Sequence, residues 1–231
     1  RELGSKRRLL LVGLSFASEV GDLKRGRGYY YPWMGSGGVF FEGIERVLNR
    51  TGHVGGAGDL PLYVFGFSGG AHFTSRLAMW APERVTAWVA HSAGWWERVE
   101  DASAAALPPG LVACGEWDER HAATFGFFTR GRAAGARLTW AVVRRSGHKR
   151  DMKFEEFARS WLDAVMGGGQ PVVVDIRDGR VVGGSVEVPV RLTSWLPVAG
   201  LVDGYADWLS WRDSVRREQS SNQSYHSPQR H

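Results

Sequence analysis

The sequence predicts an α/β protein built on a mostly parallel sheet with helices on both faces. Three observations predict this class: short apolar runs typical of buried parallel strands, amphipathic stretches with helical spacing, and a regular alternation of the two along the chain. Of the 231 residues, 43% are hydrophobic and 23% are charged, as expected for a globular protein with a sizeable core.

Strands are predicted where apolar or β-branched runs end at glycine, serine or a charged residue: residues 7–16, 62–67, 84–91, 110–115 and 137–144. Helices are predicted over residues 37–49, from Ser68 to Trp80, from about Ala123 to Ala134, and over residues 151–166. Ser36 is the expected cap of the first helix. The glycine-rich stretch 17–38 is expected to be a long loop whose aromatic residues pack locally.

The composition of the sequence changes at Gly167, so we expect a core over residues 1–166 and a β-rich extension packed on it over 167–211. In the extension, residues 172–176 and 181–190 are predicted to form a β-hairpin around Asp178-Gly179. Residues 212–231 are polar and are expected to be a disordered tail.

Charge and composition argue against several classes of function. The net charge is +5, but the basic residues are scattered rather than gathered in a stripe, which disfavours nucleic-acid binding. No apolar run is long enough for a membrane span, and the single Cys114 excludes an intrachain disulfide. No residue spacing indicates a metal site, and no nucleotide-binding motif is present. We therefore expect no metal and no cofactor.

The motif that carries chemistry is Gly66-Phe67-Ser68-Gly69-Gly70, a G-x-S-x-G sequence between a predicted strand and a predicted helix. A serine at such a turn projects its hydroxyl above the sheet, and the flanking glycines relieve backbone crowding. The amide of Gly69, at the start of the helix, is placed to donate to an oxyanion. A glycine-rich turn with a capping serine is the simpler interpretation.

Two further residues follow strand ends, which in a parallel sheet meet at one edge. Asp118 comes after the strand 110–115, and His148 comes after the strand 137–144. With Ser68 they form the chain order Ser, Asp, His of a nucleophile, an orienting carboxylate and a base. Asp118 could instead cap a helix, and Glu116 competes with it for the acid role.

Other aromatic residues and histidines rank lower as site residues. Phe67, His91, Trp95 and Trp96 are candidates for lining a substrate pocket, although core packing explains them equally well. His72, one turn after Ser68, is expected to pack rather than react.

The segments around Ser68, HSAGWW at residues 91–96, CGEWDER at 114–120 and SGH at 146–148 resemble the α/β-hydrolase superfamily. More narrowly, they are similar to bacterial esterases of the poly(3-hydroxybutyrate) depolymerase-like and dienelactone-hydrolase-like groups. The resemblance covers residues 60–150 and implies a serine hydrolase that cleaves a small-molecule or polymeric carboxylic ester. The resemblance does not decide whether the protein forms a homo-oligomer, or whether it is cytoplasmic or secreted.

The sequence departs from this family near its beginning. Such hydrolases carry a second oxyanion amide on a loop after an earlier strand, and only one strand and one helix precede the serine strand here. We therefore expect the N-terminal strands of the fold to be missing, or Ser15 or Phe16 to supply the second amide. A peptidase, thioesterase or lactonase, a non-catalytic binding protein on this fold, and an accessory protein that docks on a polymer are the alternatives.

Overall fold

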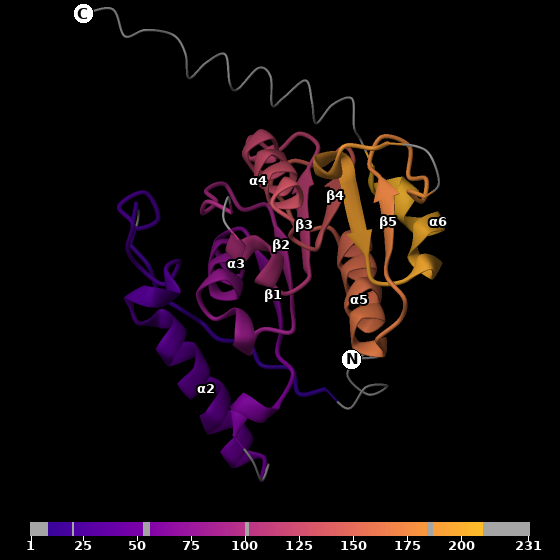
Figure 1. The fold of residues 1–231 in the computed structure, drawn as a ribbon. Helices are drawn as coiled ribbons and strands as arrows, with labels where there is room; N and C mark the ends of the chain where they lie inside the picture. Colours follow the sequence, from indigo (N-terminus) through magenta and orange to yellow (C-terminus); the bar gives the residue numbers. More distant parts are fainter. Residues whose placement is uncertain (1–8, 20, 53–55, 100–101, 184–186, 210–231) are drawn as a thin grey trace, which may run out of the picture.

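The computed structural model describes residues 9–19, 21–52, 56–99, 102–183 and 187–209. Within them lies a four-stranded parallel sheet in the order β1-β2-β3-β4, formed by β1 (Tyr63–Phe67), β2 (Ala87–His91), β3 (Gly110–Gly115) and β4 (Leu138–Val143) (Figure 1). Because the strands are parallel and sequential, their carboxyl ends lie along one edge of the sheet. The sequence-based prediction of an α/β class with a parallel sheet is therefore confirmed.

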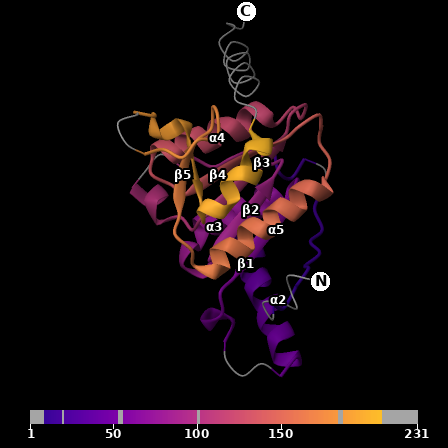
Figure 2. The same cartoon turned by 90° about the vertical axis from the view of Figure 1, so that its right-hand side faces the viewer.

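Helices cover both faces of this sheet. The α-helices of the described residues are α2 (Ser36–Arg50), α3 (Gly69–Trp80), α4 (His121–Ala133), α5 (Met152–Gly167) and α6 (Val202–Tyr205). Short 3₁₀ turns occupy Pro32–Met34, Ala57–Asp59, Pro82–Arg84, Ala102–Ala106, Val190–Leu192, Ala199–Leu201 and Ala206–Trp208. Figure 2 shows α5 lying across one face of the strands. Neighbouring residues of a strand point to opposite faces, so Trp88 packs in the core with α3 and α4, whereas Val89 packs against α5.

The helix α5 shows how local sequence sets an element. Asp151 precedes it in an extended conformation, and its carboxylate accepts a hydrogen bond from the amide of Phe154 at 2.9 Å, which is N-terminal capping. Phe154 and Trp161 are buried on one face of the helix, and Gly168 ends it with a left-handed φ of 66°.

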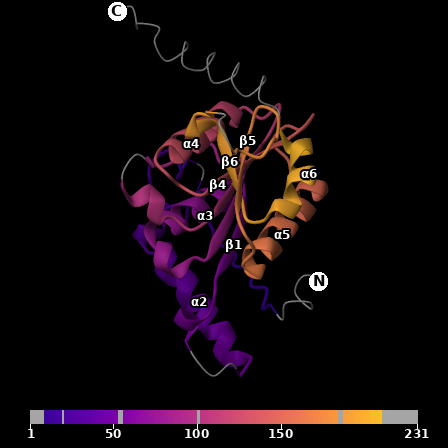
Figure 3. The same cartoon turned by 45° about the vertical axis from the view of Figure 1, so that its right-hand side comes forward.

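A two-stranded antiparallel sheet lies beside β4 (Figure 3) and consists of β5 (Val172–Asp175) and β6 (Thr193–Leu196). The Ser194 hydroxyl accepts a hydrogen bond from the amide of Trp140 at 2.9 Å, and the Tyr205 hydroxyl donates to the carbonyl of Trp140 at 2.6 Å. Side chains rather than a backbone ladder therefore satisfy the backbone groups of Trp140 at this edge of the sheet.

Among the described residues, the second strand of the predicted hairpin, 181–190, pairs with β5 only next to the turn. The turn at Asp178-Gly179 does form, with Gly179 at a φ of 77° and an isolated bridge between Val174 and Val181. The strand that pairs with β5 along its length is β6, about 20 residues further on. Valines supply strand propensity, but the buried contacts of Ser194 and Leu196 with the core decide which segment pairs.

The predicted strand over residues 7–16 is also wrong for the part described. Residues 9–19 form no regular secondary structure, and Leu11 keeps 95% of its surface exposed. An apolar run becomes a parallel strand only where a neighbouring strand offers backbone partners, and residues 9–19 have no ladder partner among the described strands. Residues 1–8 and the predicted tail 212–231 lie outside the described residues.

The cap predicted for the first helix is displaced by one residue. Gly35, at a φ of 106°, precedes α2, and Ser36 is its first residue. The Ser36 hydroxyl donates to the carbonyls of Tyr29 at 2.9 Å and Tyr31 at 3.2 Å, so it ties residues 29–33, called the aromatic loop from here on, to the start of α2. None of the helices that the structure describes has the length and apolar character that a bilayer crossing requires.

Candidate active site

Ser68 stands between the end of β1 and the first residue of α3. Its φ of 53° and ψ of −115° lie in a region that residues with side chains rarely adopt, and its amide donates to the carbonyl of His91 at 2.9 Å. A methyl group on Gly66 would lie 2.1 Å from the carbonyl oxygen of Gly70, so glycine is required at 66. At Gly70 an added methyl meets nothing within 4 Å, so the expected crowding holds at only one of the two glycines.

His148 faces Ser68 from the loop after β4. Its Nε2 lies 2.8 Å from the Ser68 Oγ, and its ring stacks on Phe67 with 5.1 Å between ring centroids and an interplanar angle of 25°. Phe67 was predicted as a pocket residue, and in the structure it is the surface on which the imidazole rests. About a third of the His148 side chain, 31%, remains exposed.

Asp118 completes a line of hydrogen bonds. Its Oδ2 lies 2.8 Å from the Nδ1 of His148, and its Oδ1 accepts from the amide and the guanidinium of Arg120 at 3.0 and 3.1 Å. A carboxylate accepts only, so Nδ1 carries the proton and Nε2 is free to accept from the Ser68 hydroxyl.

The Asp118 carboxylate is fully buried, with none of its side chain exposed. Burial acts to raise the pKa of Asp118, but hydrogen bonds from the Arg120 amide, His148 and Ser92 outweigh it and lower the pKa below its ordinary value. The carboxylate is therefore charged throughout the neutral range.

The loops that carry Asp118 and His148 are held against each other. A methyl on Gly115 would lie 2.4 Å from the carbonyl oxygen of Gly147, and the amide of Trp117 donates to the carbonyl of Ser146 at 2.8 Å. This close approach of two strand ends requires glycine at 115. It sets the spacing between the carboxylate and the imidazole.

Glu116, the competing acid, lies elsewhere. Its carboxylate accepts a hydrogen bond from the amide of Arg145 at 2.6 Å, and the carboxylate bonded to His148 belongs to Asp118. Glu116 therefore stabilises the turn after β4.

The remaining predicted residues lie at different depths in the structure, and of the pocket candidates His91 contacts Phe67. His91 has no exposed surface and lies beneath Phe67, with 5.1 Å between their ring centroids. Trp95 is 47% exposed, whereas Trp96 is partly buried and stacks on Phe127 at 4.2 Å. His72 is a packing residue with two partners: its Nδ1 contacts the carbonyl of Trp95 at 3.0 Å, and its Nε2 accepts from the amide of Gly94 at 3.2 Å.

No protein-family model, curated protein or solved structure matches this chain.

Three residues near the site were missed by sequence reasoning as site residues. Ser92, with a φ of 61° at the end of β2, and Arg120 both bond the Asp118 carboxylate. Tyr29 reaches the first residue of α3 from the aromatic loop. The clustered tyrosines were visible in the sequence, but their approach to α3 depends on how the loop is packed.

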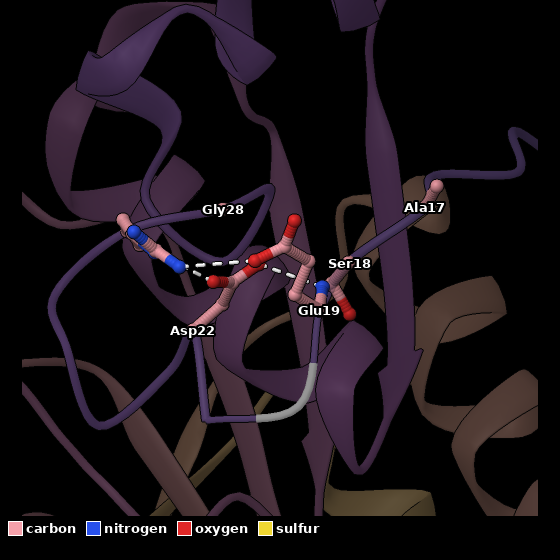
Figure 4. A pocket seen from close by; sticks show the side chains of 6 residues that line it. Ala17, Ser18, Glu19, Asp22 and Gly28 are labelled. Atoms are coloured by element: carbon pink, nitrogen blue, oxygen red, sulfur yellow. Dashed lines mark hydrogen bonds and ion pairs between the residues drawn. The ribbon is translucent and has the colours of Figure 1, made fainter.

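A hollow of about 390 Å³ opens beside this aromatic loop and is lined by Ala17, Ser18, Glu19, Asp22, Arg27 and Gly28 (Figure 4). Its charges are paired with each other: Arg27 contacts Asp22 at 2.7 Å and Glu19 at 3.0 Å. Among the described residues, no group of histidine, cysteine, aspartate and glutamate side chains could hold a metal ion.

Proposed function

We propose that this protein is a serine hydrolase that cleaves a carboxylic ester through an acyl-enzyme on Ser68. The observation that carries the proposal is the unbroken line of hydrogen bonds from Asp118 through His148 to Ser68, with 2.8 Å at both imidazole nitrogens. Three strand ends contribute to this line, in the chain order that the α/β-hydrolase resemblance implies.

In the proposed reaction, the Ser68 Oγ attacks the ester carbonyl carbon while its proton moves to the Nε2 of His148. The carbonyl electron pair moves onto the oxygen, towards the amide of Gly69, which at the first turn of α3 has no intrahelical acceptor. Collapse of this intermediate breaks the bond to the alcohol, which takes the proton from His148. Water then attacks the acyl-enzyme by the same steps and releases the acid.

The electrostatics of the three residues support these roles. Asp118 is fully buried and hydrogen-bonded, so its charge stabilises the imidazolium that forms when His148 accepts the serine proton. The serine is held in a strained backbone conformation, and such strain is concentrated at functional turns.

Labelling with a fluorophosphonate probe tests the proposal. The wild-type chain should be labelled on Ser68 and should hydrolyse p-nitrophenyl acetate or butyrate, and Ser68→Ala should lose both activities. Ser160→Ala is the matched control, because Ser160 lies on α5 and bonds only its own helix, at the carbonyl of Glu156. A folded wild-type chain that neither reacts with the probe nor cleaves these esters would overturn the proposal in favour of a non-catalytic binding protein.

A further inference from the structure

The first residue of α3 is covered by a tyrosine. A methyl group built on Gly69 would lie 2.2 Å from the hydroxyl oxygen of Tyr29, 3.4 Å from its Cζ and 3.1 Å from Cε1 of Tyr30. The Tyr29 hydroxyl thus lies against the Cα of Gly69, next to the amide that the proposed mechanism uses as an oxyanion donor. It is the tip of the tyrosine, and not its ring, that makes the closest approach.

Tyr29 is held in this position from several sides. Its ring stacks on Phe16 with 5.5 Å between centroids and an interplanar angle of 9°, and it lies 4.2 Å from the ring of Tyr30. Its carbonyl accepts the hydrogen bond from Ser36 at the start of α2. Phe16, which the sequence offered as the source of a second oxyanion amide, contacts this tyrosine through its ring. A donor held on several sides needs little reorganisation during the reaction.

The hydroxyl keeps its proton at neutral pH. Burial, together with the neighbouring Tyr30 hydroxyl, raises the pKa of Tyr29 to about 12. The Tyr30 hydroxyl in turn lies 3.0 Å from the hydroxyl of Ser18. A hydrogen bond that raises the pKa of Tyr29 is one in which Tyr29 donates and Tyr30 accepts, so an oxyanion at the site competes with Tyr30 for the Tyr29 proton.

We propose that the Tyr29 hydroxyl is the second oxyanion donor of this site, acting with the amide of Gly69. The inference rests on the proposed ester hydrolysis. When the bond from the Ser68 Oγ to the carbonyl carbon forms, the developing oxyanion accepts hydrogen bonds from both groups, and each donor keeps its proton. Tyr29 is then a catalytic residue, and Tyr30 is a positioning residue that orients its hydroxyl.

The competing interpretation is that Tyr29 only packs the aromatic loop against α3. Under that interpretation the ring carries the whole contribution and the hydroxyl is dispensable. Tyr29→Phe separates the two, because it keeps the ring, its stacking on Phe16 and the backbone bond from Ser36, and removes only the proposed donor.

Tyr29→Phe should lower kcat on p-nitrophenyl acetate by about 10²–10³-fold, the usual effect of removing one oxyanion donor, while KM changes little. Tyr30→Phe should lower kcat less. Tyr31→Phe is the matched control from the same loop, because its hydroxyl donates to the carbonyl of Leu23 at 2.7 Å, and its kcat should stay within twofold of wild type. A trifluoromethyl ketone, which forms an oxyanion on the serine, should bind Tyr29→Phe more weakly by a similar factor.

A double variant tests whether Tyr29 and Gly69 act at one site. Gly69→Ala should also lose activity, since its methyl would displace the Tyr29 hydroxyl. In the Tyr29→Phe background that oxygen is gone, so adding Gly69→Ala should cause only a small further loss in kcat. Independent, multiplicative losses in the double variant would contradict a shared oxyanion site.

The two proposals can fail separately. If Tyr29→Phe retains wild-type kcat on an enzyme whose Ser68 is labelled, the second donor is not Tyr29 and the hydrolase proposal is untouched. If the wild-type chain is neither labelled nor active, the hydrolase proposal is refuted, and the inference about Tyr29 is refuted with it.

Discussion

Replacing His91 with phenylalanine should make the protein less sensitive to acid. His91 ends β2, and its ring is fully buried between those of Phe67 and Phe154, with neither ring nitrogen hydrogen-bonded. Burial lowers the pKa of His91 to about 4, against an ordinary value of 6.5, and the negative charge of Asp118 only partly opposes this effect. The folded protein therefore holds His91 neutral at a pH where the unfolded chain protonates it.

The sign and size of the effect follow from linkage. Between pH 6.5 and pH 4 the unfolded chain binds more protons than the folded one, so the free energy of unfolding falls as the pH falls through this range. The pKa difference corresponds to a loss of about 2 kcal/mol at pH 5 and about 3 kcal/mol once the pH is below 4. Above pH 6.5 the contribution is fully present.

Urea denaturation at pH 7.5 and pH 5.0 measures the difference. His91→Phe should lose about 2 kcal/mol less than wild type between the two pH values. His72, whose pKa burial also lowers to about 4, remains in both proteins and supplies residual acid sensitivity. Because each protein is compared with itself, packing changes caused by the new ring cancel. At pH 7.5 the variant should be no less stable, since it removes two unpaired buried nitrogens.

The same loss between pH 7.5 and pH 5.0 in both proteins would falsify this reasoning, because it would show that His91 does not distinguish folded from unfolded states by its protonation. A large destabilisation of the variant at pH 7.5 would contradict the claim that the nitrogens have no partner. Both outcomes come from one set of denaturation curves.

Two other residues near the site support predictions that concern chemistry rather than stability. In the ester assay, Asp118→Asn should lower kcat by roughly 10⁴-fold, since the amide no longer holds His148 in the reactive tautomer. Glu116→Gln is the control, because it alters the bond to the Arg145 amide, and its kcat should stay within a few-fold of wild type. Equal losses in the two variants would reopen the assignment of the acid. Cys114 is buried and burial raises its pKa to about 12, so it should not react with a thiol reagent such as 5,5′-dithiobis(2-nitrobenzoate) in the native protein and should react at once in urea; fast native reaction would show that the strand β3 opens readily.

Local signals predicted the elements that depend on local interactions. The amphipathic spacing of residues such as Phe154 and Trp161 predicted α5 to within one residue at each end, because amphipathicity is encoded within one segment. The residues 62–67 became β1, with Ser68 at the turn. The strand expected at 7–16 failed because an apolar run says nothing about which backbone edges will be available to it.

The candidate site likewise contains features that the sequence predicts and features that only tertiary contacts decide. That Ser68, Asp118 and His148 lie together was predictable because a parallel sheet brings strand ends to one edge, and the roles proposed for them follow from their order along the chain. The choice between Asp118 and Glu116 was not predictable. Two carboxylates two residues apart point in different directions from one turn, and only the tertiary contacts of that turn decide which one meets the imidazole.

The position of Tyr29 depends on contacts that are further apart in sequence. The tyrosine reaches Gly69 because α2 packs against α3: Gly37 of α2 is so close to the Trp80 ring that a methyl there would lie 2.2 Å from it. The aromatic loop is tied to the start of α2 by Ser36. The serine, histidine and aspartate are held by the sheet, whereas the proposed second donor is held by the docking of one helix on another. It follows that a change that loosens α2 from α3, such as one at Gly37, should reduce kcat without disturbing the bonds among the other three residues.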